Sequence, residues 1–203
     1  MRRLASFLSF VFHPVFIPVF FILFLLYVHP IHFLGYTDQQ KKIVLLQSIA
    51  LFTFFPLVTV TLLKALGFIS SIQLKEQKDR IIPLVASGIW YFWIWYVWKN
   101  LPGQPPITIH YALGVWLSSV AALMLNTKFK ISLHAIALGT TLGMLLWMVF
   151  HERLFFGVWL SVALLITGLV SSARLLVGEH RPAEVYWGLL TGSLSVVLAA
   201  FFV

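Results

Sequence analysis

The chain has 203 residues, of which 61% are hydrophobic and only 10% are charged, and its formal net charge is +8 at pH 7. This balance lies far outside that of a soluble globular domain and predicts an integral membrane protein. The absence of cysteine excludes disulfides and thiolate metal sites. Nucleic acid is a poor candidate partner, because the basic residues lie in short segments between apolar stretches, where membrane topology alone accounts for them.

Apolar stretches of about 20 residues, the length that crosses the core of a bilayer, recur along the whole chain. The expected spans are 7–27, 43–66, 82–98, 107–125, 131–150, 154–176 and 185–203. The sequence therefore predicts an all-α polytopic transmembrane helix bundle of seven spans. Six spans are the alternative, because the segment between the third and fourth stretches is short. No linker or internal repeat divides the chain, so residues 1–203 are expected to form a single integral-membrane domain.

The first of three polar clusters stands at the start of the third expected span. It runs from Lys75 to Arg80 and is followed by Pro83. The planar guanidinium of Arg80 can bind two phosphoryl oxygens at once, and Lys75 can supply a point charge. This cluster is therefore a candidate phosphate-binding segment.

The second polar cluster stands at the start of the fifth expected span and contains Lys128, Lys130, Ser132 and His134. The hydroxyl or backbone amide of Ser132 can bind an equatorial phosphoryl oxygen, and Lys130 offers a further positive charge. His134 can act as the general acid that protonates a leaving alkoxide.

The third polar cluster, Arg174, His180 and Glu184, is the most informative, because burying such groups near lipid is expensive unless they form a site. If the last helix has already begun at His180, Glu184 lies on the same helical face. The Glu184 carboxylate can then accept a hydrogen bond from one imidazole nitrogen of His180, and the other nitrogen is left free to act as a nucleophile or base. Arg174 ends the preceding helix and can fold back to stabilise phosphoryl charge.

Even numbers of spans separate the three clusters, so they are expected to share one side of the membrane. Most basic residues fall on that side, namely Arg2, Arg3, Lys64, Lys75, Lys78, Arg80, Lys128, Lys130, Arg174 and Arg181. The opposite side carries Lys41, Lys42, Lys99 and Arg153. The positive-inside rule places the first side in the cytoplasm, although phosphate-binding cations would enrich the same side in either orientation.

The arrangement Arg174-x5-His180-x3-Glu184, with Ser132-Leu-His134 and the segment from Lys75 to Pro83, resembles the type 2 phosphatidic acid phosphatase (PAP2) superfamily. It is most similar to short bacterial membrane members, which implies a PAP2/haloperoxidase-like helical core and the inner membrane of a bacterium. The resemblance covers roughly half of the chain. It implies that His180 forms a phosphohistidine, that Glu184 orients it and that His134 is the general acid. It also implies a phosphate-binding set made of Arg174, Arg80, Ser132 and Lys75.

The sequence differs from the family pattern at several positions, among them Ala173, which replaces the serine before Arg174, and Pro83, which two isoleucines separate from Arg80. Ile131 and Leu133 replace the proline and glycine that flank the serine, and Glu184 replaces an aspartate. Leu133 does not have the backbone freedom of glycine, so the amide geometry beside Ser132 differs from that of the family.

The expected function is metal-independent hydrolysis of a lipid phosphomonoester or diphosphate in the bilayer, without a cofactor. Phosphatidate, phosphatidylglycerol phosphate and polyprenyl diphosphates represent this substrate class. One alternative is a phosphotransferase, in which an alcohol captures the phosphohistidine. Another is a non-catalytic lipid-phosphate binder or transporter that keeps the cations for substrate capture.

Ordinary structural roles are an alternative for each of these residues. The basic side chains can anchor the protein at the interface, His134 can be a packing histidine, and Glu184 can pair with Arg181 or Arg80. The remaining histidines are interpreted as interfacial or packing residues, and they are His13, His29, His32, His110 and His151. His29-Pro-Ile-His32 lacks the third ligand that a metal site would need.

Overall fold

The computed structural model describes residues 2–74, 76–153 and 157–203. These residues form helices and connecting segments, with no β-strand among them, which confirms the all-α prediction. The α-helices are α1 (Arg2–Val11), α2 (Ile17–Leu23), α3 (Asp38–Ser48), α4 (Phe55–Ala65), α5 (Ile81–Asn100), α6 (Pro106–Asn126), α7 (Leu133–Phe150), α8 (Gly157–Val177) and α9 (Pro182–Ala199). Two π-helical segments, η1 (Phe24–Val28) and η3 (Ile49–Phe54), extend α2 and join α3 to α4, and short 3-10 turns lie at η2 (Pro30–Phe33) and η4 (Lys78–Arg80).

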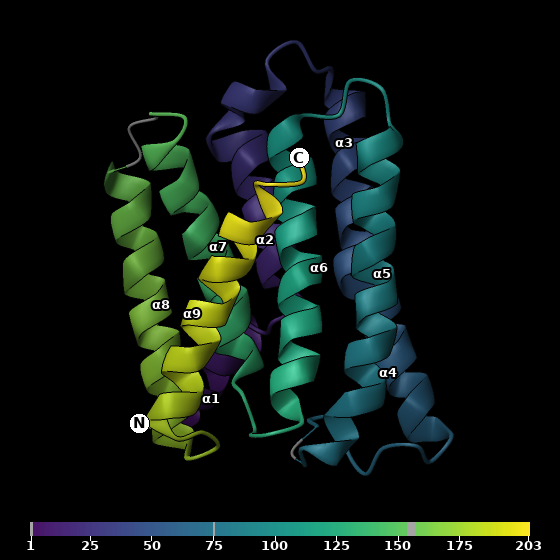
Figure 1. The fold of residues 1–203 in the computed structure, drawn as a ribbon, viewed down its shortest axis with the longest axis vertical. Helices are drawn as coiled ribbons and strands as arrows, with labels where there is room; N and C mark the ends of the chain where they lie inside the picture. The colour runs from purple at the N-terminus through teal and green to yellow at the C-terminus, as the bar shows by residue number, and fades with distance from the viewer. Residues whose placement is uncertain (1, 75, 154–156) are drawn as a thin grey trace.

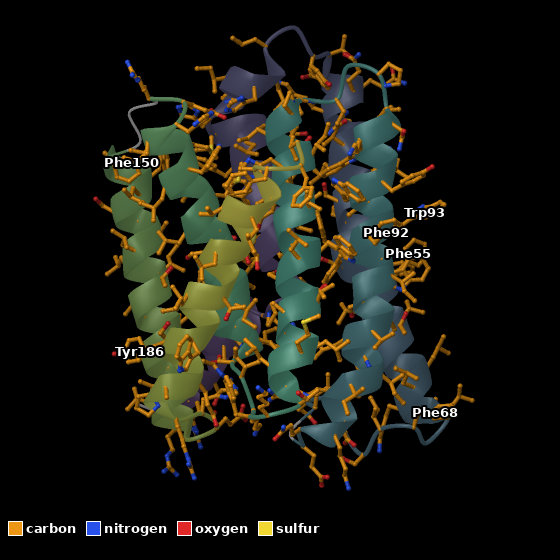
Figure 2. All side chains as sticks on the ribbon, in the orientation of Figure 1. Phe55, Phe68, Phe92, Trp93, Phe150 and Tyr186 are labelled. Carbon is orange, nitrogen blue, oxygen red and sulfur yellow. The ribbon has the colours of Figure 1, made fainter. Side chains whose placement is uncertain are left out.

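Five helices among the described residues are long and apolar enough to cross a membrane. They are Asp38–Ala65, Lys78–Asn100, Pro106–Asn126, Leu133–Phe150 and Gly157–Val177. The long helices stand side by side, and α9 leans across the front of the bundle (Figure 1). Aromatic side chains project outward from the bundle, as expected of a surface that faces lipid. They include Phe92, Trp93, Phe150 and Tyr186 (Figure 2). The chain is an integral membrane protein.

The predicted count of six or seven spans is not matched, and the difference arises at the two ends of the chain. The first expected span is divided, because α1 ends at Val11 and α2 begins at Ile17. Pro14 explains the break, since it lacks a backbone N–H and its ring clashes with the preceding helical turn. The last helix, α9, has 18 residues, but its first turns carry Glu184 and small or weakly polar side chains, and it is not among the five.

The other expected spans correspond to helices with shifted limits. The third and fourth are two separate helices, because α5 ends at Asn100 and α6 begins at Pro106. The sixth was expected to begin at Leu154, which lies outside the described residues, and its described part begins at Gly157.

Helices α7 and α9 pack against each other through glycines that leave no room for a side chain. A Cβ atom built on Gly192 of α9 would lie 2.1 Å from the carbonyl oxygen of Ile136 on α7. A Cβ atom on Gly139 of α7 would lie 2.2 Å from the carbonyl oxygen of Leu189 on α9. Small residues allow such close backbone approach between membrane helices, and here they bring the start of α9 against the start of α7.

The connections that carry the three polar clusters gather at one end of the bundle. The α4–α5, α6–α7 and α8–α9 connections all lie at the lower end in Figure 1, together with α1. The predicted co-location of the clusters is therefore confirmed. The assignment of this end to the cytoplasm stays a prediction.

Candidate functional site

The turn between α8 and α9 places His180 and Glu184 in direct contact. Gly178 makes the turn possible, because its φ of +80° lies in the left-handed region that glycine adopts without strain. Since α9 begins only at Pro182, His180 precedes the helix and does not share a helical face with Glu184. Instead, Oε2 of Glu184 folds back over the helix start, where it accepts hydrogen bonds from the Arg181 backbone N at 3.2 Å and from His180 Nδ1 at 2.9 Å.

The hydrogen bonds of His180 define its neutral tautomer. Its Nδ1 lies 2.9 Å from the Glu184 carboxylate and 3.2 Å from the backbone carbonyl oxygen of Lys130. A carbonyl oxygen can only accept, so Nδ1 carries the proton and donates it. Nε2 therefore keeps the lone pair that a nucleophile requires.

The surroundings of His180 favour this neutral form. Burial lowers the pKa of His180 below its ordinary value of 6.5, and the positive charges of Arg174 and Arg80 lower it further. The hydrogen bond and the charge of Glu184 act in the opposite direction but do not reverse the shift. The imidazole is consequently unprotonated at neutral pH, the state in which Nε2 can attack.

Arg174 stands at the end of α8 and is 7% exposed. One of its terminal nitrogens forms an ion pair with Glu179, while its Nε is buried and has no hydrogen-bond partner among the described residues. Burial favours the protonated form of Glu179, but the charge and hydrogen bond of Arg174 outweigh it and lower the pKa of the carboxyl below 4.5. Arg174 thus keeps a free N–H donor in a buried site.

Arg80 lies at the start of α5, is 5% exposed and is fixed by two backbone carbonyls. Its Nε donates to Leu74 at 2.9 Å, and its Nη1 donates to Ile131 at 2.9 Å. The second bond ties the first polar cluster to the second. Lys75, the other predicted cation of the first cluster, lies outside the described residues.

Ser132 has a structural position in this arrangement. It is fully buried, its hydroxyl accepts a 3.4 Å hydrogen bond from the Ala135 backbone N as the N-cap of α7, and its own backbone N donates to the Glu184 carbonyl at 3.3 Å. It does not belong to the residues that line the cavity described below. Its role in phosphate binding stays a prediction, whereas its role in joining α7 to the His180–Glu184 turn follows from these bonds.

His134 lines the same cavity as His180, but its ring is held by the N-terminal helix. Its Nε2 lies 2.9 Å from the backbone carbonyl oxygen of Ser9 in α1. Because that oxygen can only accept, Nε2 carries the proton, and in the neutral ring Nδ1 has none. The single N–H of His134 is thus engaged by α1 in this structure.

Two further residues of the site were not predicted. Glu179 forms an ion pair with Arg174. The only signal in the sequence for this pair was that Glu179 directly precedes His180. His13 was interpreted as a packing residue, yet it lines the cavity, and its ring centroid lies 5.6 Å from that of His134. The only sequence signal for it was a histidine-proline pair inside an apolar stretch.

A cavity of about 190 Å³ joins these groups. The charged and imidazole side chains in its lining are His13, Arg80, His134, Arg174, Glu179 and His180, and it is also lined by the polar side chains of Gln73, Ser87, Ser118, Ser119 and Thr140. Apolar side chains of α4, α5, α6 and α7 line the rest, including Val60, Leu84, Val115 and Ile136. A site with charged groups at one part and apolar walls over the remainder suits an amphiphile whose anionic group meets the arginines.

No group of three or more histidine or acidic side chains in the described part of the chain is arranged to hold a metal ion. At the other end of the bundle, His32 lies 3.2 Å from Glu152, a contact that the sequence did not predict. Comparison with protein-family models, with curated proteins and with solved structures finds no match for this chain.

Proposed function

We propose that the protein is a metal-independent lipid phosphatase of the PAP2 superfamily, which hydrolyses a lipid phosphomonoester or diphosphate through a phosphohistidine on His180. The observation that carries the proposal is the hydrogen bonding of His180, whose Nδ1 donates to Glu184 and to the Lys130 carbonyl. This leaves a lone pair on Nε2 in a cavity that also contains Arg80 and Arg174.

The proposed reaction has two steps. Nε2 of His180 attacks phosphorus while the bond to the lipid oxygen breaks, and the protonated form of His134 gives the departing oxygen a proton, which the attacking water of the second step returns. Glu184 balances the positive charge that develops on the imidazole, and the two arginines stabilise the phosphoryl oxygens. Water then attacks the phosphohistidine, which releases inorganic phosphate and regenerates the neutral histidine.

The lipid character of the substrate is supported by the shape of the cavity. Its apolar part is lined by residues deep in α5 and α6, among them Tyr91 and Tyr111, whereas the charged groups lie at the end where the helices connect. Phosphatidate, phosphatidylglycerol phosphate and polyprenyl diphosphates present this combination of anionic group and apolar chain. The inner membrane of a bacterium is the proposed location.

The proposal is tested by phosphate release from these three lipid classes, using purified protein in detergent with EDTA present. We expect His180→Ala to lower the rate by at least about 10³-fold, because removing a nucleophile removes the covalent route. His151→Ala is the matched control, since His151 is exposed and follows α7 at the opposite end of the bundle. Equal rates for the wild type and His180→Ala would exclude His180 as the nucleophile.

A non-catalytic lipid-phosphate binder is the second candidate function, and the bond between His134 Nε2 and the Ser9 carbonyl favours it. The one N–H of neutral His134 is thereby committed to α1, so in this structure His134 presents no N–H to a leaving group. To distinguish the two functions, binding of a lipid phosphate and release of inorganic phosphate are measured on the same wild-type protein. Release of phosphate identifies the phosphatase, whereas saturable binding without release identifies the binder.

The lowered pKa of His180 predicts the acid limb of the pH–rate profile. Because burial depresses this pKa, the neutral nucleophile persists as pH falls below 6.5, the ordinary value for histidine. We expect kcat/KM to decline only below about pH 6.5. The measurement is kcat/KM between pH 4.5 and 8 in a constant detergent, and an acid limb centred above 6.5 would contradict the assigned nucleophile.

A further inference from the structure

We propose that His13 is a third imidazole of this site and that it takes up a proton when a phosphate-type anion binds beside Arg174. The inference rests on the proposed function, because it assigns a role at the same site. It concerns the N-terminal helices, which contribute none of the three polar clusters.

The backbone around His13 is fixed at the break between α1 and α2. A residue before proline is disfavoured in the helical conformation, and His13, next to Pro14, lies between the end of α1 at Val11 and the start of α2 at Ile17. The turn is closed by a 2.8 Å hydrogen bond from the Phe16 backbone N to the His13 carbonyl oxygen. The Thr53 hydroxyl in η3 donates to the Val15 carbonyl at 2.6 Å and holds the turn against the bundle. His13 therefore reaches the cavity from a constrained segment.

His13 lines the cavity, and one of its ring nitrogens has no partner in the described part of the chain. Its Nδ1 is buried and has no hydrogen-bond partner among the described residues, although buried polar atoms normally have one. The ring meets His134 edge to face, with an interplanar angle of 77°. An anion oxygen in the cavity would supply the partner that Nδ1 lacks.

Besides His13, the ionisable groups that line the cavity are His134 on α7, Arg174 on α8, Glu179 and His180 in the α8–α9 turn, Arg80 at the start of α5, and the phenols of Tyr91 on α5 and Tyr111 on α6. Burial, followed by the positive charge of Arg174, lowers the pKa of His13 to about 4. His13 is thus neutral at pH 7 while no phosphate is bound.

A bound phosphate dianion reverses the electrostatic field at His13. Its negative charge offsets Arg174 and stabilises an imidazolium, so the pKa of His13 rises on binding. By linkage, a group whose pKa rises on binding takes up a proton as the ligand binds. His134 is less suited to this role, because α1 already engages its Nε2.

Isothermal titration calorimetry with inorganic phosphate tests the inference at pH 7, in buffers that differ in ionisation enthalpy. The dependence of the binding enthalpy on the buffer gives the number of protons taken up. We expect the wild type to take up more protons per bound phosphate than His13→Asn, whose amide can hydrogen-bond but does not titrate. His151→Asn, which removes an exposed histidine at the opposite end, should match the wild type.

The outcomes separate the two proposals. Equal proton uptake by the wild type and His13→Asn would overturn the role of His13 and leave the phosphate site intact. Absence of phosphate binding by the wild type would overturn the role of His13, whereas the proposed phosphatase function is decided by the lipid assay with His180→Ala. If His13→Asn does not fold, ¹⁵N NMR of histidine-labelled wild type tests the same point, because the His13 signal should shift to the protonated form when phosphate is added. An unchanged His13 signal under saturating phosphate would overturn the inference.

Discussion

Glu184→Gln is expected to lower kcat for phosphate release by about 10²- to 10⁴-fold, a range based on the effect of neutralising the carboxylate that supports a catalytic histidine. Glutamine keeps the length of the side chain but removes the negative charge 2.9 Å from His180 Nδ1. In the proposed reaction, that charge stabilises the cationic imidazole that forms as Nε2 attacks phosphorus. The measurement is kcat and KM with the preferred lipid phosphate.

Glu184→Asp is the matched control for this prediction. It keeps the charge and shortens the side chain by one methylene group, and aspartate is the residue in the PAP2 pattern that the sequence resembles. We expect this variant to retain clearly more activity than Glu184→Gln, with similar thermal stability. Activity in Glu184→Gln equal to that of the wild type would show that Glu184 serves only to cap α9, where it accepts a bond from the Arg181 backbone N.

Gly192→Ala is expected to destabilise the protein by about 1–3 kcal/mol, the usual range for overpacking a well-packed core. The added Cβ would lie 2.1 Å from the Ile136 carbonyl oxygen and 2.6 Å from the Thr140 backbone N. Because both atoms belong to the backbone of α7, no side-chain rotation relieves the contact, and α7 and α9 must separate. Reversible unfolding in mixed detergent and SDS measures the change in free energy.

The same separation should reduce the proposed phosphatase activity. Helix α9 carries Glu184, and Ser132 stands at the start of α7. The 3.3 Å hydrogen bond from the Ser132 backbone N to the Glu184 carbonyl oxygen joins the two helices. Gly168→Ala on α8 is the control, since no atom lies within 4 Å of its added Cβ. We expect that variant to match the wild type in stability and activity. Equal stability of the two variants would contradict the tight α7–α9 contact.

Hydropathy alone predicted the helical, membrane-embedded character of the chain, because lipid imposes internal backbone hydrogen bonding on every span. It did not predict the break at Pro14, although a proline marks it, since the apolar stretch continues on both sides. The limits of α9 were also missed. Its start is set by Pro182 and the folded-back Glu184, features that hydropathy does not measure.

The sequence by itself predicted that His180, Glu184 and the two arginines share one site, because charged residues in an apolar chain are few and their spacing is distinctive. Only the tertiary structure decided how these groups contact one another. Glu184 reaches His180 across a helix start, and Arg174 binds Glu179. These contacts depend on backbone direction at a turn, which residue spacing does not encode.

The tertiary structure also decided which residues of other elements enter the site. The sequence determined that the three polar clusters share one end of the bundle, because an even number of spans separates them. It gave no sign that α1 would bind His134 or that His13 would reach the cavity. Both contacts join residues more than a hundred positions apart, and helix packing, rather than local pattern, brings them together.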